Sequence, residues 1–143
     1  MLRDPGLIPL SHQHQHGLAL CVMIERGLRD TAELAAKVAD TYELELRNHF
    51  EVEEGILFPS IRESLGPAPL IDELIADHRR LEALVEQVKT GQPGALLEFA
   101  STLSGHIRRE ERELFEDVQK RLPRDELDRL GREIDSHVVR VCL

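Results

Sequence analysis

Residues 46–58 read Leu-Arg-Asn-His-Phe-Glu-Val-Glu-Glu-Gly-Ile-Leu-Phe, and part of this segment recurs later in the chain. The segment from His49 to Phe58 and the segment from His106 to Phe115 both follow the pattern His-x-x-x-Glu-Glu-x-x-Leu-Phe. Residues four apart on an α-helix lie about 40° from each other on one face, so each histidine and the glutamate four positions later can point at one place. The repeat therefore predicts two helices that each present an imidazole and a carboxylate.

Apolar residues accompany both copies of the motif on the same helical faces. Leu46 and Leu57 share the face of His49, and Leu103 flanks His106. This pattern predicts that both faces are buried. A glutamate is rarely buried without a partner charge. We therefore expect a metal ion to supply the positive charge that the two inward glutamates need.

The composition is that of an acidic chain of 143 residues with a formal net charge of −9. This charge argues against nucleic acid or an anionic membrane surface as a partner. The length suits a single domain over residues 1–143. The sequence has no membrane-length apolar run and no signal-peptide pattern, so we expect a cytoplasmic protein. Cys21 and Cys142 form neither a disulfide framework nor a CxxC pair, and we interpret them as a reduced core thiol and a tail thiol.

Helical periodicity predicts four long helices and a short fifth one, with no strand-like alternation. The expected ranges are about 11–29, 31–58, 70–90, 93–121 and 125–137. Ser11 and Asp30 are the expected N-caps of the first two helices. The second helix is expected to reach Phe58, before Pro59, with room for one more turn. The apolar face of the first helix is expected to contain Leu18, Cys21, Val22, Ile24 and Leu28.

The predicted fold is all-α, an antiparallel up-down-up-down four-helix bundle over about residues 11–122. In this fold the second and fourth helices run in the same direction, so the two copies of the motif can meet at one depth. Metal sites in such bundles are built in the core from side chains on facing helices. The short fifth helix is expected to pack outside the bundle.

A site in the bundle core also needs ligands from the first and third helices. His78 is the histidine of the third helix, and it lies on the inward stripe. At about 100° per residue, His14 points along the apolar face of the first helix, whereas His12 and His16 are displaced to the other side. We choose His14, with His16 as the reserve if the first turn is irregular. His137 is expected on the surface.

The predicted metal ligands are four imidazoles and two carboxylates, namely His14, His49, Glu53, His78, His106 and Glu110. One ion does not need this many, since zinc typically takes about four ligands. The set suits two ions bridged by the two glutamates, with a position left for water or a diatomic ligand. Imidazole with carboxylate suits iron, manganese or zinc. The Glu-x-x-His pattern of ferritin-like di-iron bundles is absent from these positions.

Four segments of the chain resemble the hemerythrin-like, or HHE cation-binding, family over about residues 9–122. They are Leu10-Ser11-His12-Gln13-His14, His49-Phe50-x-x-Glu53-Glu54-x-x-Leu57-Phe58-Pro59, Asp77-His78-Arg79-Arg80-Leu81 and His106-x-x-x-Glu110-Glu111-x-x-Leu114-Phe115. The resemblance implies a four-helix bundle that holds a non-haem di-iron centre. It also implies that the six residues named above are the ligands.

The chain departs from oxygen-carrying hemerythrins at two places. Those proteins have a fifth histidine one turn after the third-helix ligand, where this chain has Glu82. Their last motif has four residues between histidine and aspartate, whereas His106 and Glu110 enclose three. Both features match the HHE branch and argue against reversible oxygen carriage. We interpret Glu82 as an ion-pair partner of Arg79, with metal coordination as the alternative.

The residues around the predicted ligands allow further interpretations. Glu54 and Glu111 each follow a ligand, and we interpret them as solvated, with a contact to the ligands as the alternative. Tyr42 is interpreted as a core aromatic residue, with a place beside the site as the alternative. An apolar wall that keeps a bound diatomic ligand from bulk water is expected from Phe50, Phe58, Phe99 and Phe115.

Three functions fit this ligand set. The first is a protein that binds or senses oxygen, nitric oxide or peroxide, with a response to iron or oxidative stress implied by the family. The second is a di-iron enzyme of the oxidase, peroxidase or nitrosative-damage repair type, in which Cys21 takes part. The third is a structural or regulatory helical module stabilised by metal. We favour the first and predict no catalytic residue.

Overall fold

The computed structural model describes residues 2–141, and every regular element in this range is a helix. The elements are α1 Ile8–Arg26, α2 Thr31–Thr41, η1 Tyr42–Leu46, α3 Arg47–Val52, η2 Glu53–Leu57, α4 Phe58–Leu65, α5 Pro69–Lys89, α6 Ala95–Arg109, η3 Glu110–Leu114, α7 Phe115–Arg121 and α8 Arg124–His137. The three η elements are π-helical turns. Residues 31–65 therefore form one continuous rod, the α2–α4 rod, and residues 95–121 form another, the α6–α7 rod.

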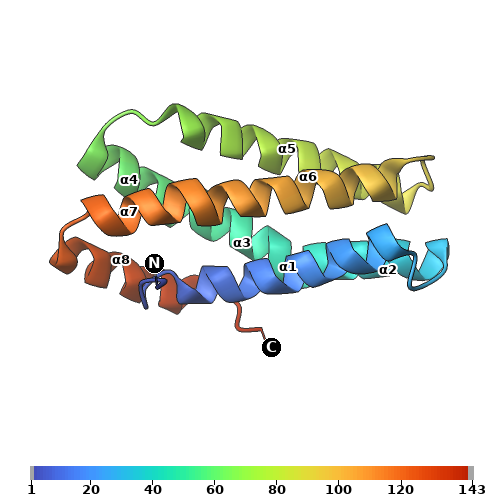
Figure 1. The fold of residues 1–143 in the computed structure, drawn as a ribbon, viewed down its shortest axis with the longest axis horizontal. Coiled ribbons are helices and arrows are strands. Elements are labelled where there is room, and N and C mark those ends of the chain that lie inside the picture. Colours follow the sequence, from blue (N-terminus) through green and yellow to red (C-terminus); the bar gives the residue numbers. More distant parts are fainter. Residues whose placement is uncertain (1, 142–143) are drawn as a thin grey trace.

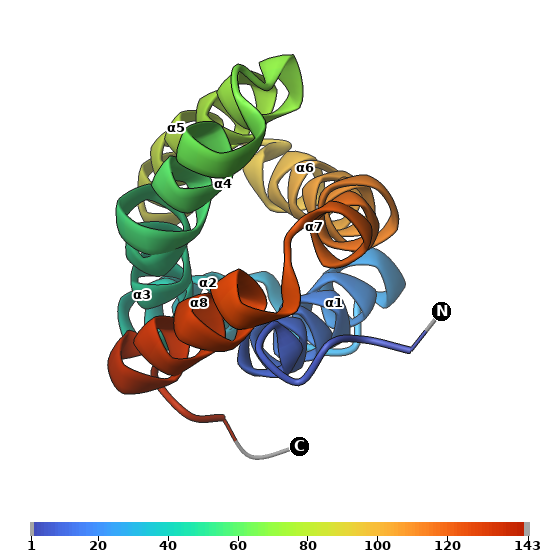
Figure 2. The same cartoon turned by 90° about the vertical axis from the view of Figure 1, so that its left-hand side faces the viewer.

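The four long rods form a ring of antiparallel neighbours (Figure 1). α1 packs against α6, α6 against α5, α5 against α2, and α2 against α1. Figure 2 shows this ring from one end. The α2–α4 and α6–α7 rods lie diagonally opposite and run the same way, so the predicted all-α bundle with an extra C-terminal helix is confirmed. Within residues 2–141, no helix is both long and apolar enough to cross a membrane.

The start of α1 differs from the prediction. Leu7 is the N-cap, and Pro9 lies in the first turn, where a missing N–H leaves no bond unmade. Ser11 lies inside the helix and donates its hydroxyl hydrogen to Glu111 Oε2 at 2.7 Å. The predicted cap at Ser11 is wrong because Pro9 permits an earlier helix start.

The end of α1 also differs from the prediction. Gly27 adopts a left-handed conformation with φ of 59°, and Leu28 N–H bonds to Met23 O at 3.1 Å. Leu28 is 50% exposed because it lies beyond the helix end, and Val22 is 41% exposed. Leu20 is buried instead. The first helix therefore contributes a narrower apolar face than expected.

Pro59 does not end the second rod, which continues to Leu65. The last hydrogen bond of η2, from Phe58 N–H to Glu53 O, spans five residues, so Pro59 follows a π-helical turn. It occupies one of the first two positions of α4, where a missing N–H costs little. The rod ends before Gly66, which has φ of 84°.

Other helix ends match the predictions. The Asp30 side chain accepts a hydrogen bond from Glu33 N–H at 2.8 Å, as expected for an N-cap. α5 ends at Lys89, and Gly91 follows with φ of 74°. Glycine reaches this left-handed region without steric cost, so it stops the helix.

Two apolar clusters fill the bundle, one towards each end. The first, called the proximal cluster, includes Leu10, Phe58, Leu74, Phe115 and Ile134. The second, called the distal cluster, includes Leu20, Phe50, Leu81, Phe99 and Ile107. Along every rod, the predicted metal ligands fall between members of the two clusters. The candidate site is therefore at mid-length, with an apolar core on each side.

The sequence predicted that the fifth helix packs outside the bundle. In the structure this helix, α8, contributes its apolar side to the core. Its residues Leu127, Leu130 and Ile134 are buried in the proximal cluster. Figure 1 shows that α8 covers the end of the bundle beyond the start of α1. Gly131 and Gly6 come so close that a Cβ on Gly131 would lie 2.7 Å from the Gly6 Cα atom. The short α1 leaves this end of the core open, and α8 closes it.

Candidate metal centre

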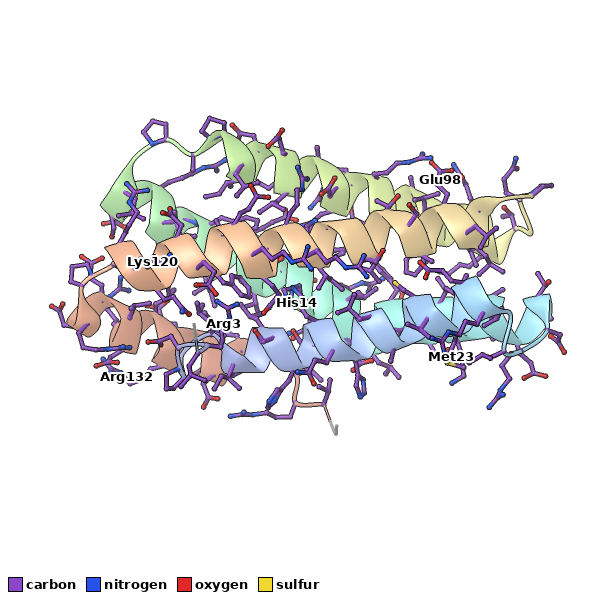
Figure 3. All side chains as sticks on the ribbon, in the orientation of Figure 1. Arg3, His14, Met23, Glu98, Lys120 and Arg132 are labelled. Carbon is purple, nitrogen blue, oxygen red and sulfur yellow. The ribbon has the colours of Figure 1, made fainter. Side chains whose placement is uncertain are left out.

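The six side chains predicted as ligands meet in the middle of the bundle. Their ligand atoms form two groups, each within 4.8 Å of one another: His14, His49, Glu53 and Glu110, and Glu53, His78, His106 and Glu110. All six side chains are buried, and Glu53 and Glu110 have no exposed surface. Figure 3 shows His14 at mid-length between α1 and the α6–α7 rod. The geometry thus defines two adjoining positions that share the two glutamates.

The remaining histidines lie outside both groups. The reserve ligand, His16, contacts Glu45 Oε1 through Nδ1 at 2.6 Å, and its side chain is 37% exposed. His12 is half-buried, and His137 is exposed. Of the three histidines near the start of α1, the structure therefore brings only His14 to the cluster.

Both shared glutamates begin a π-helical turn, Glu53 in η2 and Glu110 in η3. Each rod has a row of buried residues at intervals of four, at 49, 53, 57 and 61 and again at 106, 110, 114 and 118. In a pure α-helix each such interval drifts by about 40°, so three of them would turn the stripe away from the core. The wider π turn absorbs this drift. Repeated four-residue intervals are the sequence signal that could have predicted these turns.

Each of the four imidazoles is held at its outer nitrogen, Nδ1, by a side chain from the next rod of the ring. These side chains, called the outer partners, are Gln13 for His49 at 2.9 Å, Glu54 for His78 at 2.6 Å, Asp77 for His106 at 2.9 Å and Glu111 for His14 at 2.6 Å. An acceptor at Nδ1 places the ring hydrogen there. The lone pair of a neutral ring is then on Nε2, which faces the centre.

The interpretation of Glu54 and Glu111 as solvated is wrong, and the alternative holds. Each residue follows a ligand and is turned by about 100° around the helix, towards the neighbouring rod. Its carboxylate therefore reaches the imidazole of that rod. Gln13 and Asp77 adjoin ligands in the same way, but the sequence alone predicted no role for them. The signal was their position beside His14 and His78.

The three outer carboxylates are backed by arginines. These ion pairs are Arg3 with Glu111 at 3.2 Å, Arg109 with Asp77 at 2.6 Å, and Arg79 with Glu54. Burial opposes ionisation of Asp77, but the hydrogen bonds from His106 and Arg109 outweigh it and lower the pKa of Asp77. Burial opposes ionisation of Glu111 too, but hydrogen bonds from His14 and Ser11 and the charge of Arg3 lower its pKa. At Glu54, burial outweighs Arg79 and raises the pKa. Asp77 and Glu111 thus keep negative charge beside the outer face of His106 and His14, which increases the basicity of Nε2.

The inner atoms of the cluster fit cations. His14 Nε2 and His49 Nε2 are 3.0 Å apart, and both rings have their hydrogen bond at Nδ1. Two facing lone pairs at this distance repel unless a proton or cation lies between them. The Oε2 atoms of Glu53 and Glu110 are buried without a hydrogen-bond partner among the described residues. Such orphaned acceptors are costly in a core, and a metal ion satisfies them.

Without a metal ion, the carboxylates and imidazoles of the cluster bind protons at the positions where cations would bind. Burial, followed by the charge of Glu110, raises the pKa of Glu53 well above its usual value. Burial opposes ionisation of Glu110, but His106 outweighs it and lowers the pKa of Glu110. Burial lowers the pKa of His78 to about 2, whereas Glu110 and Asp77 overcome burial and raise the pKa of His106 to about 10. Metal ligation requires these protons to leave.

Aromatic rings cover several of the imidazoles. Phe50 stacks on His78 with ring centroids 4.0 Å apart, and Phe58 is stacked on the same ring at 6.0 Å. Phe115 stacks on His14 at 5.4 Å. Phe99, which was expected in the same wall, is fully buried in the distal cluster. The apolar wall around the site thus includes three rings in direct contact with imidazoles.

The other residues considered around the site have peripheral positions. Tyr42 is half-buried, with its ring 6.4 Å from that of Phe50. Glu82 pairs with Arg79 at 3.3 Å and belongs to neither ligand group, as interpreted from the sequence. Cys21 is buried in the distal cluster, where burial raises its pKa to about 12. Its thiol stays protonated, which does not favour a catalytic role; Cys142 lies outside the described residues.

A helical bundle that buries four imidazoles and two carboxylates around one centre has the construction of a metal-binding bundle protein. The family model of the hemerythrin HHE cation binding domain matches residues 9–118. The chain belongs to this family, and the resemblance found in the sequence is confirmed. No curated protein and no solved structure gives a significant match. The matched range includes every predicted ligand and every outer partner, and it ends before α8.

Proposed function

We propose that the protein binds two iron ions and uses them to capture or sense oxygen, nitric oxide or peroxide. The observation that carries the proposal is the pair of buried glutamates, Glu53 and Glu110, which belong to both groups of ligand atoms. Each has one oxygen without a hydrogen-bond partner among the described residues. Two shared carboxylates between two pairs of imidazoles suit a pair of ions better than a single ion.

The proposed ligands divide evenly between the two ions. His14 and His49 would hold one ion, His78 and His106 would hold the other, and Glu53 and Glu110, which belong to both groups, would be shared. Two imidazoles and two carboxylate oxygens give each ion four protein donors. Imidazole with carboxylate and an open position is typical of non-haem iron, and zinc or manganese would accept the same donors.

The surrounding residues would control what reaches the ions. An iron pair with an open position supplies electrons and a binding site to a small oxygen or nitrogen ligand. Phe50, Phe58 and Phe115 pack against the imidazoles and exclude bulk water from the centre. The outer partners fix the rings so that little reorganisation accompanies ligand binding.

The metal and its reactivity can be tested on protein purified without added metal. We expect elemental analysis to find iron, and anaerobic loading with Fe(II) to give two ions per chain. Exposure to air or nitric oxide should then produce a ligand-to-metal absorption band. A colourless product that holds one ion and does not react with oxygen would contradict the proposal.

Binding and sensing can be separated from catalysis by counting turnovers. Our proposal expects stoichiometric uptake of oxygen or peroxide by the iron-loaded protein, even with a reductant in excess. Many turnovers per centre would favour the enzyme instead. The protonated, buried thiol of Cys21 supports the first result, since a thiol with a pKa of about 12 is a poor nucleophile.

A second function, stabilisation of the fold by metal, is favoured by the position of the cluster between the two apolar clusters. A metal that binds only the folded chain stabilises it by about 2.7 kcal/mol at a free concentration of 100 times Kd. Chelation should therefore lower the melting temperature. If the apo and metal-loaded forms melt at the same temperature, metal has no structural role.

A further inference from the structure

His49 is held by an amide, whereas the other three imidazoles are held by carboxylates. His49 Nδ1 donates to Gln13 Oε1 at 2.9 Å. The amide nitrogen of Gln13 donates to Val139 O at 3.0 Å and to Asn48 Oδ1 at 3.2 Å. Gln13 is only 2% exposed, so these contacts satisfy a buried amide. The hydrogen bonds that orient His49 therefore extend through Gln13 to the backbone that follows α8.

Asn48, on the α2–α4 rod, forms hydrogen bonds with the same stretch of backbone. Its amide nitrogen donates to His137 O at 2.8 Å, and its Oδ1 accepts from Val139 N–H at 2.7 Å. Val138 is 8% exposed and belongs to the proximal cluster. Residues 137–139, called the C-terminal segment, are thus docked by a buried side chain and by backbone hydrogen bonds. The segment lies outside residues 9–118, which match the family.

We propose that Gln13 and Asn48 are positioning residues that couple metal binding at the position of His14 and His49 to docking of the C-terminal segment. This inference rests on the proposed function, because it requires the cluster to bind metal. A ligating His49 needs its lone pair on Nε2 and therefore its hydrogen on Nδ1, facing an acceptor. Gln13 presents an acceptor only in one of its two amide orientations.

The C-terminal segment selects that orientation. Val139 O can only accept a hydrogen bond, so it requires the amide nitrogen of Gln13, and the amide oxygen then faces His49. Asn48 Oδ1 accepts from the same nitrogen, but the orientation of the Asn48 amide is itself set by His137 O and Val139 N–H. If the segment undocks, both acceptors for the Gln13 amide nitrogen lose their fixed positions, and the selection is lost. The opposite orientation would direct an N–H at His49 Nδ1 and move the ring hydrogen to Nε2, where it blocks ligation. The docked segment therefore favours the tautomer that binds metal.

The other position has no such dependence. Glu54 and Asp77 hold His78 and His106 with carboxylates, which accept hydrogen bonds in any orientation. Arg109 fixes the carboxylate of Asp77 at 2.6 Å. Undocking of the C-terminal segment should therefore lower the affinity for the ion at the position of His14 and His49. The affinity for the other ion should not change. By linkage, metal binding must in turn favour docking of the segment.

Three variants separate the parts of this coupling. Asn48→Ala removes both hydrogen bonds to the segment and the bond that Asn48 Oδ1 accepts from Gln13, so the Gln13 amide can turn once the segment undocks. Gln13→Glu keeps an acceptor for His49 in every orientation but places a carboxylate against Val139 O, which undocks the segment. Arg140→Ala is the control, since Arg140 pairs with Asp135 and is adjacent to the segment.

Zinc titration followed by calorimetry measures the two ions separately. We expect Asn48→Ala to lower the affinity for one of the two zinc ions by about 5-fold or more, which is the lower end of the range of allosteric coupling. Gln13→Glu should bind both ions at least as well as the wild type, and Arg140→Ala should match the wild type. Circular dichroism checks that each variant is folded. Two ions of unchanged affinity in Asn48→Ala would overturn the coupling.

Hydrogen exchange of the Val139 amide supplies a readout that does not depend on activity. Zinc loading should slow this exchange in the wild type and in Arg140→Ala, but not in Gln13→Glu, although that variant is fully loaded. A wild type that binds two zinc ions without any change in Val139 exchange overturns the coupling alone. A wild type that binds neither zinc nor iron overturns the proposed function as well.

Discussion

His14 Nδ1 donates a hydrogen bond to Glu111 Oε2 at 2.6 Å, although 97 positions separate the two residues in the chain. Glu111 Oε2 also accepts from Ser11, and Arg3 contacts Oε1. Two other side chains, those of Ser11 and Arg3, thus fix the carboxylate that fixes the imidazole. The same relationship recurs around the ring of rods, where a residue next to one ligand holds the ligand of the neighbouring rod. The orientation of the four buried imidazoles therefore depends on the packing of all four rods.

Removal of one outer partner should weaken metal binding without removing a ligand. For Glu54→Ala we expect affinity to fall by about 10- to 100-fold, because His78 loses the acceptor that sets its tautomer and orientation. Glu82→Ala is the matched control, since Glu82 also pairs with Arg79, whereas the hydrogen-bond partner of His78 Nδ1 is Glu54. Metal competition with a chelator measures both variants. Equal affinities in the two would show that Glu54 acts only as a surface charge.

Substitution of a histidine in the cluster should lower the metal content, whereas substitution of a surface histidine should not. His49→Ala and His106→Ala each remove an inward Nε2 atom, so both should lower the metal content of the purified protein. His137→Ala should leave it unchanged, because His137 is exposed and contacts Glu133 O. Elemental analysis of the three proteins tests this. Similar losses in all three would show that metal content reports folding rather than ligation.

The meeting of the six candidate ligands could be predicted from the sequence because it depends on which residues of each helix face the core. His14 was separated from His12 and His16 by its angle to the apolar face, and the structure places it in the cluster. The repeated motif located His49 and His106 in the same way. Helical periodicity suffices here because the sequence of a single helix shows which of its residues face the core.

The outer partners could not be predicted as firmly, because they depend on which rods are neighbours. Asp77 reaches His106 only because α5 packs against α6, and Gln13 reaches His49 only because α1 packs against the α2–α4 rod. The position of α8 has a similar cause, since its role depends on how much core α1 leaves open. Tertiary packing, rather than periodicity, decides these features.

The close approach of Gly131 to Gly6 predicts a strong effect of a single methyl group. A Cβ at position 131 would lie 2.7 Å from the Gly6 Cα atom, so α8 must shift away from the proximal cluster. We expect Gly131→Ala to destabilise the protein by roughly 1–3 kcal/mol. Denaturant unfolding measures the change.

Gly105→Ala is the matched control for Gly131→Ala. Gly105 lies inside α6 and is exposed, and a Cβ atom added there would meet no other atom within 4 Å. An alanine at this position should stabilise the helix by about 0.5–1 kcal/mol, because glycine loses more backbone entropy on folding. If both variants were stabilised, the helix would tolerate a shift of α8, and the contact with Gly6 would not constrain the fold.

The ion pair between Asp4 and Arg124 should make stability depend on acid pH. Asp4 Oδ2 is 2.6 Å from Arg124 Nη1, and Arg124 lowers the pKa of Asp4 despite the opposing effect of burial. A carboxyl group with a lower pKa in the folded chain stabilises it above the unfolded pKa, and this contribution disappears as pH falls through the folded pKa. Asp4→Asn should therefore lower the melting temperature at pH 7, and its difference from the wild type should shrink as pH falls from the usual pKa of an aspartate through the lower pKa of folded Asp4. Asp128→Asn removes the exposed partner of the same arginine and should have a smaller effect at every pH. A constant difference for Asp4→Asn from pH 7 to pH 2 would mean that the charge of Asp4 does not stabilise the docking of α8.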